Sequence, residues 1–509
     1  MNANLYALYR SRFPADPHAP FMELDDGSSV AFGDVIARSG RIAALLRALG
    51  VGKGDRVAVQ VEKSAHTVCL YLACLQIGAI HLPLNTAYTV SEIAYFVGDA
   101  EPKAIVCDPA SEAALAPIAA QRAGTHLLTL AADGSGSLVA GAREHAPLEE
   151  IAQADADDIA AILYTSGTTG RSKGAMLSHG NLASNVQALH EAWGFRPDDV
   201  LIHALPLFHT HGLFVALNLM LWNGGRMILM QRFDPERVIG AMSRATILMG
   251  VPTFYTRLLQ SPRLDRAAAA RMRLFVSGSA PLLAETHRAF AQRTGHAILE
   301  RYGMTETCMN TSNPLDGERR AGTVGPPLPG VEVRVRGKDG EILAPGAIGV
   351  LEVRGPNVFK GYWRMPEKTA SEFREDGFFI TGDLASISDD GYVTIVGRDK
   401  DLVITGGYNV YPKEVESALD AMDGVVESAV VGLPHPDLGE AVVAVVSTGG
   451  AAPGDAAAYI AALRETLAAY KVPKRVFFVD DLPRNTMGKV QKNMLRERFA
   501  DAFAPSADA

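Results

Sequence analysis

A segment between residues 164 and 174 gathers the residue types that bind a polyphosphate. It reads YTSGTTGRSKG and follows the apolar run IAAIL. Glycines let backbone amides approach oxygen atoms, hydroxyls donate hydrogen bonds, and Lys173 supplies positive charge. The Gly-Lys-Ser/Thr order of a P-loop is absent, so this is a different kind of phosphate loop. By composition alone, a flexible surface loop remains an alternative.

Four further segments place charged or aromatic residues among glycines. They are Tyr302-Gly-Met-Thr-Glu-Thr307, Thr381-Gly-Asp383, GRDKDLVITGGYN from residue 397 and PRNTMGK ending at Lys489. Each residue taken singly also fits an ordinary role, with Asp383 as a turn former, Glu306 as a solvated charge and Lys489 as a surface lysine. The five segments together, in this order, resemble the adenylate-forming superfamily, which includes acyl-CoA synthetases, peptide-synthetase adenylation domains and firefly luciferases.

The resemblance implies an ATP site. In relatives the tyrosine matching Tyr302 stacks on adenine, Thr305 contacts phosphate, and Glu306 helps to hold Mg²⁺. The aspartate matching Asp383 accepts hydrogen bonds from the ribose hydroxyls, and Arg398 lies near the ribose. The residues that we expect to bind ATP or AMP are Thr165, Ser166, Gly167, Thr168, Thr169, Gly170, Lys173, Gly278, Ser279, Ala280, Tyr302, Gly303, Thr305, Asp383 and Arg398.

The resemblance also implies two reaction steps. The lysine matching Lys489 reaches the α-phosphate and the carboxylate during adenylation, so Lys489, Thr165 and Glu306 are the expected catalytic residues. The C-terminal domain of relatives then rotates, and a thiol enters along a tunnel matching Gly406, Gly407 and Tyr408. By motif position we place the hinge at Lys400.

The chemistry explains this residue choice. Attack of a carboxylate on the α-phosphate of ATP brings two anions together, so catalysis consists mostly of charge neutralisation and alignment. Cations, hydroxyls and Mg²⁺ meet that need without a covalent enzyme nucleophile. We therefore expect Cys308 to be a small packing residue.

The acid pocket of relatives matches PLFHTHG from residue 206, SGSAP from residue 277 with the helix after it, and Gly303-Met304. Arg288 on that helix, with His209 and His211, indicates an anionic substrate, because an unpaired buried guanidinium is costly. An extended segment would point both histidines the same way, ahead of a helix opening at Gly212. The expected acid-binding residues are Arg288, His209, His211, Ser277 and Met304.

Alternative roles for these residues stay open. Arg288 could pair with a surface acid such as Glu285, and Arg257 is a weaker candidate for the same role. The HTHG string also suggests zinc, but no third ligand stands at metal spacing.

The whole chain resembles the malonyl-CoA synthetases most, through HALPLFHTHGLF, MGVPTFYTRLL and ETHRAF. In those enzymes an arginine matching Arg288 meets the second carboxylate. The resemblance predicts ATP-dependent ligation of malonate to CoA through an acyl-adenylate, with Mg²⁺, and methylmalonate or another short diacid stays open. Alternatives are a short-chain monocarboxylate synthetase and a stand-alone amino- or aryl-acid adenylation enzyme.

Rival functions lack their signatures. The segment PLFHTHGL carries no acidic residue to hold a substrate ammonium, as a peptide-synthetase domain needs, and no carrier domain follows. A luciferase would add an aromatic luciferin pocket and often a Ser-Lys-Leu ending. A non-enzymatic ATP-binding or scaffold role conflicts with the full set of catalytic motif residues. Relatives are acetylated at the position of Lys489, so an acetyltransferase and deacetylase are possible partners.

Composition sets the class of protein. The 509 residues are 48% hydrophobic and 21% charged, with a net charge of −9 and four cysteines without disulfide or zinc spacing. The polar N-terminus lacks a signal-peptide core and no apolar run could span a bilayer, so we expect a cytoplasmic protein without a membrane span. The acidic balance disfavours nucleic-acid binding, because that needs a basic face.

Hydrophobic periodicity predicts an α/β fold that positions these motifs. Strands are expected at 56–61 and 104–107 and in DDVLIHALPL, GRMILM, ATILMGVP and MRLFVSGSAP, and helices at 35–49 and 66–77. The expected domains are 1–398, with a β-rich subdomain at about 322–398, a hinge at 399–401, and a small mobile α+β domain at 402–509. The last should hold helices near 412–422 and 455–470 and strands at 425–431 and 441–447.

Overall fold

The computed structural model describes residues 2–165, 172–405, 408–450, 455–485 and 488–503. Two compact units divide the chain, and each is described by itself. The first unit holds Met1–Ala321, Gly325–Glu332 and Val353–Phe379, and the second holds Gly322–Val324, Val333–Glu352 and Ile380–Ala509. The phosphate loop and the acid segments therefore belong to the first unit, whereas Asp383, Arg398 and Lys489 belong to the second.

A six-stranded sheet carries the phosphate loop. Its order is β6-β5-β3-β4-β7-β8, all parallel except for β8, which runs antiparallel to β7. The strands are β3 (Arg56–Gln60), β4 (Ile80–Pro83), β5 (Ala104–Cys107), β6 (His126–Thr129), β7 (Ile159–Thr165) and β8 (Lys173–Ser178). Apart from β6 and the ends of β7 and β8, their residues are mostly buried, as expected for a parallel sheet with helices on its faces.

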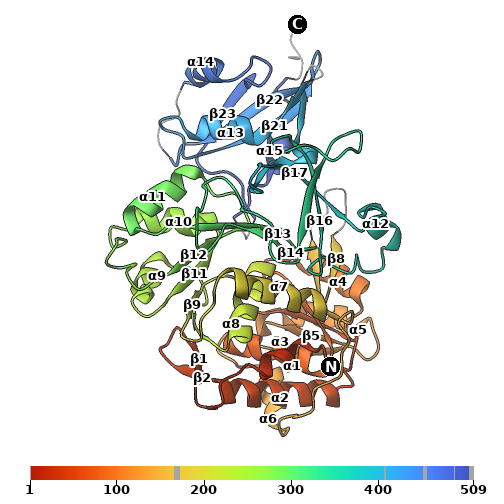
Figure 1. Cartoon of the computed structure of the whole chain (residues 1–509). Helices are drawn as coiled ribbons and strands as arrows, with labels where there is room; N and C mark the ends of the chain where they lie inside the picture. The colour runs from red at the N-terminus through yellow and green to blue at the C-terminus, as the bar shows by residue number, and fades with distance from the viewer. Residues whose placement is uncertain (1, 166–171, 406–407, 451–454, 486–487, 504–509) are drawn as a thin grey trace. The chain divides into compact units, whose positions relative to one another are not determined.

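The helices near this sheet are α1 (Leu5–Arg10), α2 (Phe32–Ala48), α3 (Ala65–Ile77), α4 (Val90–Ala100), α5 (Glu112–Ala120), α6 (Ser137–Arg143) and α7 (His179–Ala192). Figure 1 shows α1, α2 and α3 gathered near the N-terminus. Helix α3 is apolar and almost wholly buried. Ser64 caps the start of the helix, because its hydroxyl accepts a hydrogen bond from the Thr67 amide, and the helix ends at Gly78 in a left-handed conformation.

An eight-stranded sheet carries the acid segments. Its order is β14-β13-β12-β11-β9-β10-β1-β2. The strands are β1 (Pro20–Glu23), β2 (Ser29–Ala31), β9 (Val200–His203), β10 (Arg226–Leu229), β11 (Ile247–Gly250), β12 (Leu274–Ser277), β13 (Leu299–Met304) and β14 (Cys308–Ser312). Because β9, β11, β12 and β13 run parallel, the residues that follow His203, Gly250 and Ser277 emerge at one edge of the sheet, which is where α/β sheets bind ligands.

The helical elements near this sheet include a π-helix, η2, at His211–Leu217. The α-helices are α8 (Asn218–Asn223), α9 (Pro235–Met242), α10 (Pro252–Gln260) and α11 (Ala284–Thr294), and α12 (Pro366–Ser371) follows later in the first unit. A core cluster joins the buried side chains of β9, α9, α10 and α11, with Ile202, Val238, Tyr255 and Phe290 among them.

The later part of the chain forms two smaller sheets. A four-stranded sheet has the order β15-β16-β17-β18, with β15 (Glu332–Arg336), β16 (Gly349–Arg354), β17 (Phe379–Ile387) and β18 (Val393–Arg398). The 3-10 helix η3 (Asp399–Asp401) follows. A five-stranded sheet then holds β19 (Val403–Thr405), β20 (Tyr408–Val410), β21 (Glu427–His435), β22 (Gly439–Ser447) and β23 (Arg475–Val479), with α13 (Pro412–Asp420), α14 (Ala456–Thr466) and α15 (Lys492–Arg498).

The α/β fold class is confirmed, and the predicted strands and helices named above are present within a few residues. The sequence did not predict β17, which carries Thr381-Gly-Asp383, nor β1 and the edge strand β2. The boundary at residue 398 stays a prediction, because the compact units divide the chain at other positions. Among the described residues, no helix is both long and apolar enough to cross a membrane.

A buried ion pair secures the starts of three strands of the eight-stranded sheet. Asp199, just before β9, accepts hydrogen bonds from Arg273 Nε at 2.7 Å, the Thr246 hydroxyl at 2.8 Å and the Arg196 amide at 2.7 Å. Burial by itself would raise the pKa of Asp199, but these hydrogen bonds lower it below its ordinary value.

Replacing Arg273 with Met should therefore lower the free energy of unfolding by about 3–5 kcal/mol at pH 7, because the Asp199 charge stays buried without its partner. The low pKa stabilises the fold above the pKa of the unfolded carboxyl, and that gain is lost as the pH falls. We expect the deficit, measured by urea unfolding, to shrink below about pH 4.

The matched control is Arg263→Met, which removes an ion pair with Glu236 whose side chains are 61% and 48% exposed. It should cost less than about 1 kcal/mol. Equal losses in the two variants would show that the buried ion pair stabilises the fold no more than the exposed one.

Candidate active site

The two ends of the phosphate loop are fixed by hydrogen bonds. Thr165 ends β7 and pairs in register with Lys173, which begins β8. At one end the Tyr164 hydroxyl donates to Asp99 at 2.5 Å, and at the other the Tyr95 hydroxyl donates to the Ser172 carbonyl at 2.8 Å. The predicted residues Ser166, Gly167, Thr168, Thr169 and Gly170 lie outside the described residues.

Lys173 and Glu306 contact the same tyrosine. The Lys173 ammonium lies 4.2 Å from the centre of the Tyr362 ring, and the Tyr362 hydroxyl donates to Glu306 Oε1 at 3.0 Å. Lys173 also pairs with Glu372 at 3.5 Å. The sequence reading named Lys173 and Glu306 but missed Tyr362, which joins them. A cation and a carboxylate are thus brought into one group, as a metal-bound polyphosphate would require.

Magnesium fits this part of the site through Glu306. The described residues contain no group of three or more acidic, histidine or cysteine side chains arranged to hold a metal ion. Mg²⁺ commonly uses one or two protein carboxylates together with substrate phosphates and water. The carboxylate of Glu306 is 6% exposed and suits that role.

The histidine segment folds differently from our expectation. Had the segment been extended, His209 and His211 would lie on one face. Thr210 instead has helical dihedral angles, the Leu213 amide donates to the His209 carbonyl at 2.9 Å, and His211 begins the π-helix. His211 is fully buried while His209 is half-buried, so the extended geometry is wrong. Gly212 permits the turn, since a Cβ there would lie 1.9 Å from the Pro206 carbonyl oxygen.

His211 faces the second acid segment. Its Nδ1 lies 3.2 Å from the Ser279 hydroxyl, and its Nε2 is buried with no hydrogen-bond partner in the described part of the chain. Desolvation lowers the pKa of His211 well below its ordinary value, and the charge of Arg301 lowers it further. The imidazole is therefore neutral at pH 7 and can offer Nε2 to a ligand.

Arg301 is the residue that the sequence reading missed. It precedes Tyr302 on β13, is 4% exposed, and has Nε and Nη2 without hydrogen-bond partners among the described residues. Its guanidinium packs over Gly278, where a Cβ would lie 2.3 Å from Cζ. Burial lowers the pKa of Arg301 to about 9. No local signal marked this residue, because LERYGM holds Glu300 beside Arg301 and does not form an apolar run.

Arg288 lies in a different environment. It is on α11 and exposed, and no described residue forms a hydrogen bond or ion pair with it, so the surface pair with Glu285 is absent. Its role toward the second carboxylate stays a prediction, but the desolvation that this role needs surrounds Arg301 instead. Arg257 on α10 is also exposed. Ser277, at the end of β12, is buried with an unpartnered hydroxyl.

The remaining residues of the Tyr302 motif form a tight turn between β13 and β14. Tyr302, Gly303, Met304 and Thr305 are partly buried. Gly303 packs so closely that a Cβ would lie 1.8 Å from the Cys308 carbonyl oxygen. Cys308 is 1% exposed, and burial raises the pKa of its thiol to about 12, consistent with a packing residue.

The second unit brings together three predicted charges. Asp383 on β17 is 4% exposed and pairs with Arg398 Nε at 2.6 Å. Lys489 lies in a turn whose amide hydrogen bonds tie it to Asn485. Although Lys489 retains exposed surface, desolvation is the main cause of a lowered pKa, followed by the charge of Arg398, while Asp383 opposes the shift.

The predicted hinge and thiol residues lie in the same unit. Lys400 is the middle residue of η3, and the adjacent Asp401 accepts a hydrogen bond from Arg496 at 2.7 Å. Desolvation lowers the pKa of Lys400. Tyr408 is 59% exposed and stacks on Tyr470 with ring centres 4.8 Å apart. The predicted Gly406 and Gly407 lie outside the described residues.

Comparison with known proteins gives the family. The profile of the AMP-binding enzyme family matches residues 10–363, and that of the AMP-binding enzyme C-terminal domain matches residues 414–489. The chain is 37% identical to a feruloyl-CoA synthase of Amycolatopsis over 95% of the chain and 96% of the relative. It is 35% identical to a malonate–CoA ligase of Arabidopsis thaliana, covering 93% and 85% of the two chains.

The solved structures agree. A structure of ATP-bound MatB from Rhodopseudomonas palustris is 59% identical and covers 99% of this chain and 100% of its own, with a TM-score of 0.96. The predicted superfamily is thus confirmed, and the phosphate loop, the Tyr302 motif and the Lys489 turn all fall on elements that the matched profiles span. This chain belongs to the AMP-binding enzyme family, and it is an acyl-CoA ligase.

Proposed function

We propose that this chain ligates malonate to coenzyme A through malonyl-adenylate. The observation that carries the proposal is the buried guanidinium of Arg301, which has two nitrogens without partners among the described residues and lies against Gly278. The similarity to a malonate–CoA ligase supports the same substrate.

A dicarboxylate explains a cation in this position. Burial of an unpaired charge costs several kcal/mol, and an anion that binds beside it recovers much of that cost. One carboxylate of malonate reacts, and the other remains charged and can accept hydrogen bonds from Arg301 Nε and Nη2. A monocarboxylate offers no second anion, so it leaves the guanidinium unpaired.

The neighbouring groups suit a short anion. The neutral His211 imidazole adds a polar atom without adding a second positive charge that would repel Arg301. Ser277 contributes a buried hydroxyl that also lacks a described partner. Unsatisfied buried polar groups of this kind disfavour an alkyl chain, which could not hydrogen bond with them.

The reaction follows from the charges. A carboxylate oxygen of the acid attacks the α-phosphorus of ATP, and the bond to pyrophosphate breaks. Lys489 would stabilise the charge that develops on the α-phosphate, while Lys173 would stabilise the leaving pyrophosphate. The CoA thiolate then attacks the acyl carbon, and AMP leaves. Mg²⁺, when bound through Glu306, would neutralise phosphate charge.

Arg301→Met should lower kcat/KM for malonate by about 10²–10³-fold, which corresponds to roughly 3–4 kcal/mol of lost pairing. The value for propionate should change less than about 5-fold, because propionate has no group that uses the contact. Thermal melting of the free variant should not fall, since removing an unpaired buried charge stabilises the fold. Initial rates at fixed ATP, Mg²⁺ and CoA give the comparison.

Arg288→Ala is the matched arginine control. If it alone produces the malonate-specific loss, the second carboxylate is held by Arg288 as the sequence predicted, and Arg301 has another role. If the parent enzyme does not favour malonate over propionate and butyrate, the diacid assignment fails and the chain is a monocarboxylate ligase.

Lys489→Gln should abolish adenylation while sparing thioester formation from supplied acyl-adenylate, because the ammonium acts in the first transition state only. Acetylation at the same nitrogen would remove the charge in the same way. Pyrophosphate release and AMP release, followed separately, give the two half-reactions. Equal loss of both would contradict a role limited to adenylation.

Lys400→Pro should leave adenylate formation measurable and stop transfer to CoA, because proline fixes the backbone dihedral that a hinge must change. Lys413→Ala, on the following helix, serves as a control for the loss of a lysine. Unchanged overall turnover in Lys400→Pro would place the hinge at a neighbouring residue such as Asp399 or Asp401.

A further inference from the structure

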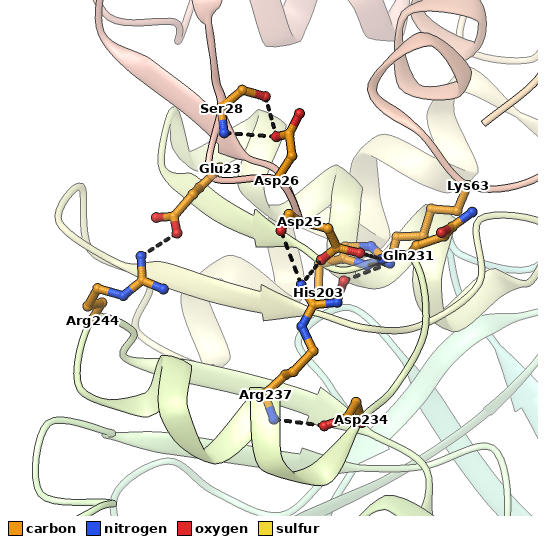
Figure 2. Close-up of polar contacts among 10 residues, drawn as sticks. All are labelled: Glu23, Asp25, Asp26, Ser28, Lys63, His203, Gln231, Asp234, Arg237 and Arg244. Carbon is orange, nitrogen blue, oxygen red and sulfur yellow. Dashed lines mark hydrogen bonds and ion pairs between the residues drawn. The ribbon is translucent and has the colours of Figure 1, made fainter. Parts of the chain in front are cut away.

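Lys63 is a buried lysine that connects the two large sheets of the first unit. It lies between β3 of the six-stranded sheet and the start of α3, and it is 7% exposed. Its ammonium contacts the end of β9 in the eight-stranded sheet, where it lies 2.8 Å from His203 Nδ1 and 2.6 Å from the His203 carbonyl (Figure 2). It also lies 2.9 Å from the Leu205 carbonyl.

These three contacts use every N–H of a charged ammonium. The other ring nitrogen of His203, Nε2, lies 2.8 Å from the Gly212 carbonyl oxygen. A carbonyl only accepts, so Nε2 must carry the proton and Nδ1 must accept from Lys63. The arrangement therefore requires a neutral His203, in agreement with a pKa that desolvation and the charge of Lys63 hold well below its ordinary value.

No carboxylate among the described residues forms an ion pair with Lys63. The charge of Asp25 acts on Lys63 from a distance, but its carboxylate accepts hydrogen bonds from the Gln231 amide at 3.0 Å and Arg237 Nη2 at 2.7 Å (Figure 2). Desolvation lowers the pKa of Lys63 well below its ordinary value. A buried charge in this state costs stability, so packing alone does not explain it.

The contacts of Lys63 fix the chain on both sides of the histidine segment. The carbonyls of His203 and Leu205 precede the turn, and the His203 ring holds Gly212, directly after His211. Gly212, at the end of this turn, packs against Pro206 at its start. Lys63 thus secures the start of the π-helix, whose first residue, His211, faces Ser279 and lies within the electrostatic range of Arg301.

We propose that Lys63, acting through His203, is a positioning residue that sets the place of His211 in the acid-binding pocket. The inference rests on the proposed function only in taking His211 as part of that pocket. Lys63 does not touch the substrate. Its effect should therefore appear in the binding of the acid and not in the binding of ATP, because its three contacts are to His203 and Leu205 and none reaches β7 or β8, which flank the phosphate loop.

Lys63→Met tests the proposal, because methionine keeps much of the side-chain volume and removes all three donors. We expect the KM for malonate to rise about 10–100-fold, since small misplacements of a binding group have effects of this size. The KM for ATP should stay within about 2-fold, because the phosphate-loop anchors are untouched. Lys53→Met is the control, because Lys53 is a half-exposed lysine that pairs with Asp158 away from the segment.

His203→Phe provides a second test that keeps the bonds of Lys63 to the two carbonyls and cuts the link to Gly212. It should raise the KM for malonate with the KM for ATP unchanged. If Lys63 acts through His203, the double variant should lose little more than the worse single variant. This variant also keeps the proposal testable if Lys63→Met does not fold, which thermal melting would reveal.

Equal changes in the KM for acid and ATP, or additive effects in the double variant, would overturn the positioning role. The proposed function fails separately, when the parent enzyme does not prefer malonate. In that case the same ratio of acid KM to ATP KM, measured with whichever acid the parent enzyme uses, still decides the role of Lys63.

Discussion

The proposed acid site depends on a buried guanidinium for which the described residues supply no counter-charge. Arg301 lies on a strand of the eight-stranded sheet, packs over Gly278 and is 4% exposed, so it has little contact with water. Stability alone does not favour this arrangement, because a hydrophobic residue would cost less. If the proposed function holds, an anion that binds beside Arg301 would recover part of this cost. Selectivity for a charged acid would then follow from desolvation more than from shape.

Two buried histidines, His203 and His211, remain neutral, and burial is the main reason. Desolvation lowers the pKa values of both His203 and His211, with nearby positive charges adding to the effect. Neutral rings can accept or donate one hydrogen bond at each nitrogen without adding repulsion. In the proposed acid site, the positive charge of Arg301 is therefore accompanied by the neutral ring of His211 and the hydroxyl of Ser277. Lys63 donates instead to the backbone carbonyls of His203 and Leu205.

The charged residues that we assign to phosphate binding differ from Arg301 in their surroundings. Lys173, Tyr362 and Glu306 form one connected group at the first unit's phosphate loop, and Asp383, Arg398 and Lys489 form another within the second unit. Lys173 is paired with Glu372 and Arg398 with Asp383, so these cations do not carry the cost that Arg301 does. Paired charges can exchange partners as phosphates arrive and leave, which suits a site that binds ATP and releases pyrophosphate and AMP.

The sequence by itself determined the family, the α/β class, several buried strands of the sheets and the positions of the motifs, because these depend on hydrophobic periodicity and on short ordered motifs. It predicted that the second carboxylate of the substrate binds to Arg288, because this arginine lies on the helix that follows the motif SGSAP. Only the tertiary structure showed that Arg288 is exposed and Arg301 buried, and that Lys63, 140 residues from His203 in sequence, reaches that histidine. The physical reason is that desolvation depends on all the neighbours in space, and neighbours brought by other strands leave no local pattern in the chain.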